Sequence, residues 1–184
     1  QYMTMLGGAY SFSDDLALMV MTNFTQNFMQ MKIASGAGGK DFTMKSSGLG
    51  DTTFLGKYRA YADDNLVPTK QVGLLFGLSI PTGSIEKKFR NNTVNSQNGT
   101  LLPFKMQLGS GTIDPIIGLT YQGARDPFWW GINTRLEAHL YKNDQGYHRG
   151  QEFQYDFYVM KQVHDKVVVH TQLNGWWEGT YSNE

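Results

Sequence analysis

The chain has 184 residues, of which 40% are apolar, and its sixteen basic and sixteen acidic residues leave no formal net charge. This length fits a single domain, and the balanced charge offers no electrostatic attraction to nucleic acid, so no nucleic-acid partner is expected. The sequence contains no run of about eighteen apolar residues, which excludes a membrane-spanning helix of ordinary length, and it has no cysteine for a disulfide.

Alternating apolar and polar residues predict β-strands rather than helices. Within 16–31 the large apolar residues Leu18, Val20 and Phe24 fall on even positions, whereas Asn23 and Thr25 fall on odd ones. Seven other segments repeat this two-residue period. The predicted strands, in chain order, are 2–12, 16–31, 47–61, 71–81, 109–123, 128–142, 151–163 and 167–180.

The connections between these segments alternate strictly between short and long. Short ones are predicted at 13–15, 62–70, 125–126 and 164–166, and long ones at 32–46, 83–108 and 143–150. Outer-membrane barrels have tight periplasmic turns and extended external loops, so this order predicts an all-β fold, an antiparallel up-and-down transmembrane β-barrel. The longest loop, 83–108, has the length to fold inward.

The same topology makes a prediction about the chain ends. If the short turns are periplasmic, both ends lie outside, although such barrels normally keep both ends in the periplasm. We therefore expect residues 1–184 to be a single β-barrel domain truncated at both ends, with eight strands visible of ten to twelve or more.

Several short motifs resemble those of one known family. They are Ser47-Gly48-Leu49-Gly50-Asp51-Thr52, Lys57-Tyr58-Arg59, Gly77-Leu78-Ser79-Ile80-Pro81-Thr82-Gly83-Ser84 and Leu108-Gly109-Ser110-Gly111-Thr112. In order and spacing they resemble the outer-membrane transporters named for the meta-pathway of phenol degradation, and the likeness covers nearly the whole chain. This resemblance implies an outer-membrane barrel of around twelve strands that admits small organic compounds, aromatic ones among them.

Charged or titratable side chains recur on the face that the alternation assigns to the lumen. These are Asp51, Lys57, Arg59, Asp114, Arg135, Glu137, His139, Glu152, Asp156, His170 and Glu178. One interpretation is a pore lining that sets the charge preference for solutes. The other is a structural network of internal ion pairs, because an unpaired charge away from water is costly.

Methionines also gather on the inner face, at Met3, Met5, Met19, Met21, Met29 and Met31. They are expected to pack against an inward loop or plug, or to form an adaptable apolar lining for hydrophobic solutes. A third interpretation is Cu(I) binding with help from His139 or His170, because thioethers are soft ligands. The pattern as a whole predicts no metal site and no cofactor.

Catalysis is not expected. His139, Asp156 and Ser110 contain the side chains of a triad, but they lie on different predicted segments and lack a nucleophile elbow. The acidic pairs at 14–15 and 63–64 lack the ligand spacing of a calcium loop and fit tight turns better.

These observations predict a bacterial outer-membrane pore for passive passage of small organic molecules, including aromatic or hydrophobic ones. The alternative is a closed structural or interaction barrel that acts as a membrane anchor or as part of a surface complex. A soluble lipocalin-like binder is disfavoured. Such a barrel holds an apolar ligand inside, whereas the barrel predicted here has a charged interior and an apolar exterior. The expected partners are membrane lipid, lipopolysaccharide and small organic solutes, together with a homo-oligomer or a surface complex.

Overall fold

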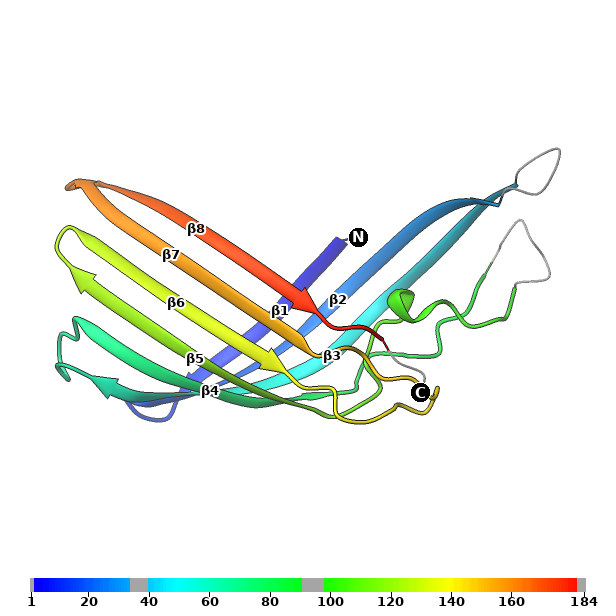
Figure 1. Cartoon of the computed structure of the whole chain (residues 1–184), viewed down its shortest axis with the longest axis horizontal. Coiled ribbons are helices and arrows are strands. Elements are labelled where there is room, and N and C mark those ends of the chain that lie inside the picture. The colour runs from blue at the N-terminus through cyan, green and yellow to red at the C-terminus, as the bar shows by residue number, and fades with distance from the viewer. Residues whose placement is uncertain (1, 34–39, 91–97, 182–184) are drawn as a thin grey trace.

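A computed structural model describes residues 2–33, 40–90 and 98–181, apart from the side chains of 31–33 and 40–42. The eight predicted strands form one antiparallel sheet in which each strand pairs with its neighbour in sequence (Figure 1). The predicted all-β, up-and-down fold class is thus confirmed. The strands are β1 (Tyr2–Ser11), β2 (Leu16–Ile33), β3 (Lys40–Ala62), β4 (Lys70–Ile80), β5 (Asp114–Arg125), β6 (Phe128–Glu137), β7 (Glu152–His164) and β8 (Val167–Glu178).

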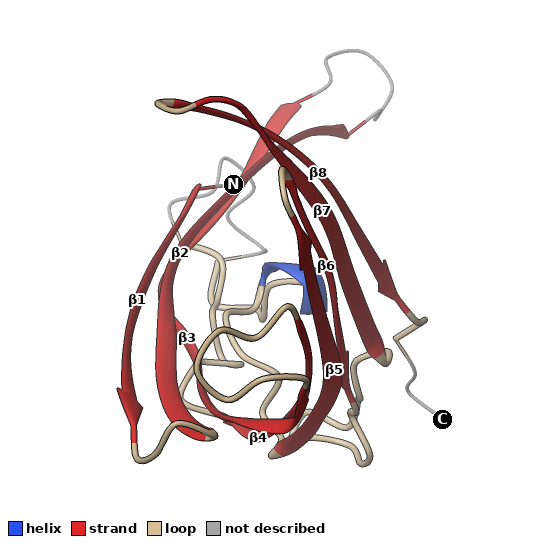
Figure 2. Cartoon of the chain, turned by 90° about the vertical axis from the view of Figure 1, so that its left-hand side faces the viewer, coloured by secondary structure: helices blue, strands red, loops and turns tan. Residues whose placement is uncertain are grey.

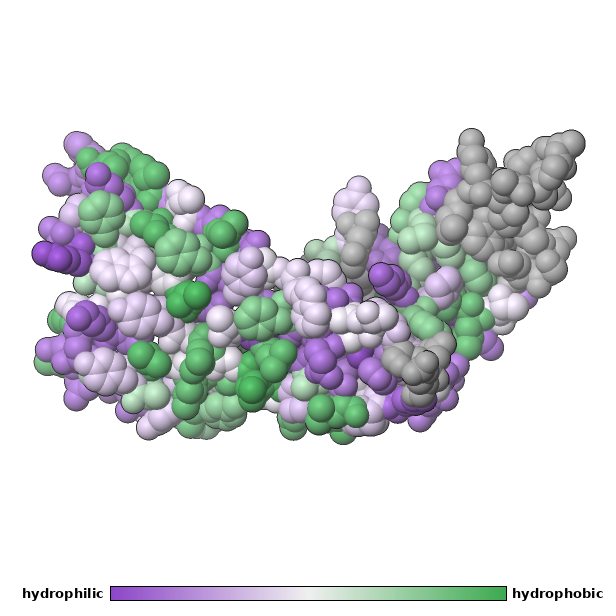
Figure 3. Space-filling model, in the orientation of Figure 1, coloured by the Kyte–Doolittle hydropathy of each residue, from purple (hydrophilic) through white to green (hydrophobic). Residues whose placement is uncertain are grey.

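The sheet curls into a half-barrel whose two edges are β1 and β8 (Figure 2). Its two faces differ as the alternation predicts. On β5 the outward Ile117 and Leu119 are 60% and 55% exposed, whereas the inward Ile116 and Thr120 are 1% and 6% exposed. Apolar side chains cover much of the strand region, and hydrophilic ones gather at the tips of the turns (Figure 3).

The predicted short turns lie at one end of the sheet, and the long β4–β5 and β6–β7 connections lie at the other (Figure 1). β1 begins, and β8 ends, at the end with the long connections. No helix in the described part of the chain has the length and apolar character that a membrane span requires, a finding that concerns helices alone. The 3-10 helix η2 (Phe104–Met106) lies within the β4–β5 connection.

Three predicted boundaries are wrong. The segment 32–46 was expected as a loop, but β2 and β3 continue their ladder through pairs such as Phe28 with Lys45, so they form an extended hairpin. Its tip, 34–39, lies outside the described residues. β5 starts at Asp114 instead of 109, and β6 ends at Glu137 instead of 142. In place of a neighbouring strand, the Asp51 side chain accepts from the Ser110 N–H, and the Gln151 side chain accepts from the His139 N–H.

The described parts of the β4–β5 connection, 81–90 and 98–113, fold against the inner face, as the length of this loop allowed. Ser46 Oγ on β3 donates a hydrogen bond to the carbonyl of Met106 at 2.6 Å. Met44, also on β3, packs in a buried apolar cluster with Phe89, Leu102 and Met106. We call these described parts the inner loop. They occupy lumen space at the long-loop end of the half-barrel.

Candidate functional site

A cavity of about 700 Å³ lies between the inner face of the sheet and the inner loop. It brings together five of the predicted lumen residues, which are Asp51, Arg135, Glu137, Glu152 and Glu178. Met3, Met5 and Met21 line another part of its wall. The cavity therefore combines charged groups, thioethers and the aromatic side chains of Phe104, Trp176 and Tyr181.

Asp51 fastens both ends of the inner loop to β3. Its carboxylate accepts hydrogen bonds from the backbone N–H groups of Gly83 at 2.9 Å and Ser110 at 2.6 Å. Glycine is needed here for close approach, because a Cβ atom on Gly83 would lie 2.7 Å from the Cα atom of Gly109. The Asp51 carboxylate thus positions the inner loop in addition to placing a negative charge in the cavity.

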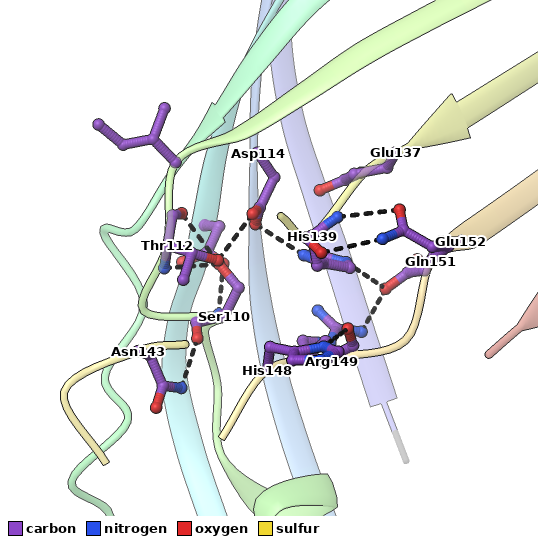
Figure 4. Close-up of polar contacts among 12 residues, drawn as sticks. Ser110, Thr112, Asp114, Glu137, His139, Asn143, His148, Arg149, Gln151 and Glu152 are labelled. Carbon is purple, nitrogen blue, oxygen red and sulfur yellow. Dashed lines mark hydrogen bonds and ion pairs between the residues drawn. The ribbon is translucent and has the colours of Figure 1, made fainter. Parts of the chain in front are cut away.

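His139 lies between two carboxylates, just after β6 (Figure 4). Its Nδ1 atom is 2.9 Å from Asp114 Oδ2, and its Nε2 atom is 3.6 Å from Glu152 Oε1. Burial alone would lower the pKa of His139, but the contacts with Asp114 and Glu152 outweigh it and raise this pKa to about 9. Gln151 holds the His139 backbone by accepting from its N–H and donating to its carbonyl.

Arg149 extends this network, although sequence reasoning missed it. Its guanidinium lies 2.5 Å from Glu152 and 3.4 Å from Glu178, and a separate pair joins Arg135 to Glu137 at 2.6 Å. Burial alone would lower the pKa of Arg149. The negative charge of Glu152 and the other neighbouring groups outweigh burial and raise this pKa above its usual value. No signal of alternation could identify Arg149, because it lies on the β6–β7 connection, where no strand period exists.

Aromatic rings close the same end of the cavity. Phe104 of the inner loop stacks on Tyr147 of the β6–β7 connection with ring centroids 4.0 Å apart. Tyr147 in turn lies 6.3 Å from Tyr181, which follows β8, and Lys105 Nζ lies 5.9 Å from the Tyr181 ring. Two connections and the segment after β8 therefore meet beside the ion pairs.

Four predicted lumen residues lie away from this cavity. Lys57 and Arg59 line a small pocket near the short turns, where Arg59 pairs with Asp15 at 2.7 Å. Asp156 accepts from Asn133 at 2.8 Å, and His170 on the edge strand β8 lies 6.2 Å from the ring of Tyr158. Arg59, Asp156 and His170 thus have local partners of their own, outside the charged cavity.

The remaining methionines follow the predicted face where it is described. Met19 and Met29 are opposite Leu55 and Met44 in the β2–β3 ladder. The side chain of Met31 lies outside the described residues. Met3 Sδ accepts a hydrogen bond from Asn23 Nδ2 at 3.3 Å, and Cu(I) binding stays one of the three interpretations of the methionines.

The residues considered as a catalytic triad do not assemble into one. The ring of His139 contacts Asp114 and Glu152 in place of Asp156, and Ser110 Oγ donates to the Thr112 carbonyl. The acidic turns behave as expected, since Asp63 accepts from the N–H groups of Thr69 and Lys70.

A family model described as "Putative MetA-pathway of phenol degradation" matches residues 2–183. No curated protein matches the chain. The family match spans nearly the whole sequence and includes every motif on which the resemblance depended. Together with the curled antiparallel sheet, it shows that this chain belongs to the family named for the MetA-pathway of phenol degradation.

Proposed function

We propose that the protein is an integral outer-membrane barrel protein that lets small organic molecules, aromatic or hydrophobic ones included, cross the membrane passively. The observation that carries this proposal is the polarity of the curled sheet. Large apolar side chains are exposed on its outer face, and a cavity lined with charged and polar groups lies on its inner face. A soluble protein has no reason to expose so many apolar side chains, whereas lipid covers them in a membrane.

The inner loop gives the proposed pore its constriction. It is tied to β3 through Asp51 and Ser46, so it narrows the lumen at the end with the long connections. A solute that enters there meets charged groups on one part of the wall and methionines on another. Such a lining suits small molecules that carry both a polar group and an apolar ring. Nothing in this arrangement calls for catalysis, so transport is proposed in place of an enzymatic role.

Single-channel recording in planar lipid bilayers tests this proposal. The purified protein is expected to give small conductance steps, and D51A is expected to give larger ones, because the inner loop loses two hydrogen bonds to β3. A matched control is D156N, whose carboxylate does not contact the inner loop. Liposome swelling with phenol and with a sugar then measures solute preference. Fractionation of cell membranes by density, with lipopolysaccharide as the outer-membrane marker, tests the proposed location.

The second candidate is a closed barrel that serves as an anchor or as part of a surface complex. The internal ion pairs and the inward loop favour it, since both take up lumen space. If neither the unmodified protein nor D51A conducts, the pore proposal fails and the closed barrel remains.

A further inference from the structure

Three metal-ligating side chains meet at the long-loop end of the sheet (Figure 4). Ile116 on β5 is opposite Glu137 on β6, and the hydrogen bond from Ala138 N to the Pro115 carbonyl carries this pairing one step further. Asp114 is therefore placed beside His139. One donor atom from each of Asp114, Glu137 and His139 lies within 4.8 Å of the other two, and all three residues are buried.

The facing atoms of Asp114 and His139 form an ion pair, but this pair is poorly aligned for a hydrogen bond. Asp114 Oδ2 and His139 Nδ1 are 2.9 Å apart in this ion pair, and both side chains are fully buried. Burying polar atoms in this way is costly. Two ligand atoms that share one tetrahedral Zn²⁺ ion, each about 2.1 Å from it, are about 3.4 Å apart, so a shift of about half an ångström from the 2.9 Å separation admits the ion.

The second oxygen of each of the two carboxylates is already held, and a further carboxylate lies beside the second ring nitrogen of His139. Thr112 Oγ1 donates to Asp114 Oδ1 at 2.7 Å, and Arg135 donates to Glu137 Oε2 at 2.6 Å. The Nε2 atom of His139 faces the Glu152 carboxylate. Metal-binding histidines and carboxylates are typically oriented by such outer partners, and a carboxylate behind the histidine is one of them.

The charges of the network also favour a cation. Within the described part of the chain, the carboxylates of Asp114, Glu137, Glu152 and Glu178 face two guanidinium groups, those of Arg135 and Arg149. A proton on His139 balances one of the two surplus negative charges, whereas a divalent ion balances both. The donor set of one imidazole and two carboxylates suits a first-row transition ion better than Ca²⁺ or Mg²⁺, which prefer oxygen ligands alone.

We propose that Asp114, Glu137 and His139 bind one divalent transition-metal ion, with Zn²⁺ as the best fit, and that Glu152 orients His139. The ion joins the end of the inner loop, which precedes Asp114, to the start of the β6–β7 connection, which follows His139. It therefore stabilises the two connections that form the mouth of the cavity. This site is independent of whether the cavity conducts solutes.

The test measures Zn²⁺ binding to the detergent-folded full chain after treatment with a chelator. Isothermal titration and elemental analysis are expected to give one Zn²⁺ per chain. H139Q and E137Q are expected to weaken binding at least about 100-fold, and E152Q about tenfold, because it removes only an orienting group. H170Q is the matched control, since this histidine lies on β8 away from the cluster and its loss is expected to leave binding unchanged.

Titration with Co²⁺ adds a spectroscopic signature, because visible absorption bands report direct coordination and are expected to vanish in H139Q. Circular dichroism checks that each variant folds, and E137Q, which keeps the side-chain shape, decides the matter if H139Q does not fold. The proposal is overturned if the unmodified protein binds no Zn²⁺ at micromolar concentration. It is equally overturned if H139Q and E137Q both bind Zn²⁺ as the unmodified protein does.

Discussion

At the scale of single residues, the inner face is organised by pairing. Arg149 contacts Glu152 and Glu178, Arg135 contacts Glu137, and His139 lies between two carboxylates. Each partner is only partly accessible, so a lost guanidinium leaves carboxylates that water solvates poorly. Arg149 connects the β6–β7 connection to the start of β7 and to the end of β8.

Replacing Arg149 with methionine keeps much of the side-chain length but removes its charge. The carboxylates of Glu152 and Glu178 then lose their shared partner, and the free energy of unfolding is expected to fall by about 2 kcal/mol. This value lies below that for a fully buried pair, because the Arg149 side chain is 28% exposed. Urea unfolding in detergent measures the change, and R125M on an exposed arginine serves as the control. Equal effects of both variants would show that the Arg149 contacts contribute nothing specific.

At the scale of elements, sequence alternation identified all eight strands and their order. It works because each strand has one face toward the interior and one away from it, which imposes a period of two on the residues. The pattern fails where the strand is irregular. In β3 a bulge adds one residue between the partners of Thr22 and Phe24. The inward side chains therefore change from odd to even positions, as Asp51 and Ser46 show.

The candidate site could be predicted only in part for a related reason. Glu137, Glu152 and Glu178 lie on strands, so their face follows from the alternation. Arg149 and Tyr147 lie on connections, where only tertiary contacts decide which way a side chain points. The pairing of His139 with Asp114 depends on the β5–β6 register, which the sequence pattern does not specify.

The inner loop is the element whose position most affects function, and a disulfide tests that position. The chain has no cysteine, so a pair introduced at Ser46 and Met106 is unique. Because Ser46 Oγ lies 2.6 Å from the Met106 carbonyl, S46C/M106C is expected to crosslink under mild oxidation, as gel mobility with and without reductant shows. In S46C/K166C the second cysteine lies in the short turn at the far end of the sheet, so no intramolecular crosslink is expected. Failure of the first pair to crosslink would place the loop elsewhere.

At the scale of the whole molecule, the sheet separates two environments, and the membrane proposal depends on which face meets lipid. Leu119 is 55% exposed on the outer face of β5, whereas Thr53 on β3 lines the inner cavity. In a soluble protein, a charge at either position has access to water. In a bilayer the outer position is surrounded by hydrocarbon, and the inner one stays in a polar lumen.

An arginine substitution at each position separates these cases. L119R is expected to lower the stability of the protein folded into lipid vesicles by about 2–4 kcal/mol, the cost of an arginine near the bilayer midplane. T53R is expected to cost under about 1 kcal/mol, because its guanidinium faces the carboxylates and water of the cavity. Urea titration in vesicles, followed by tryptophan fluorescence, measures both. Equal losses of stability in both variants would contradict a lipid-facing outer surface. A loss confined to L119R requires hydrocarbon on the outer face, because water around an exposed arginine makes it cost little.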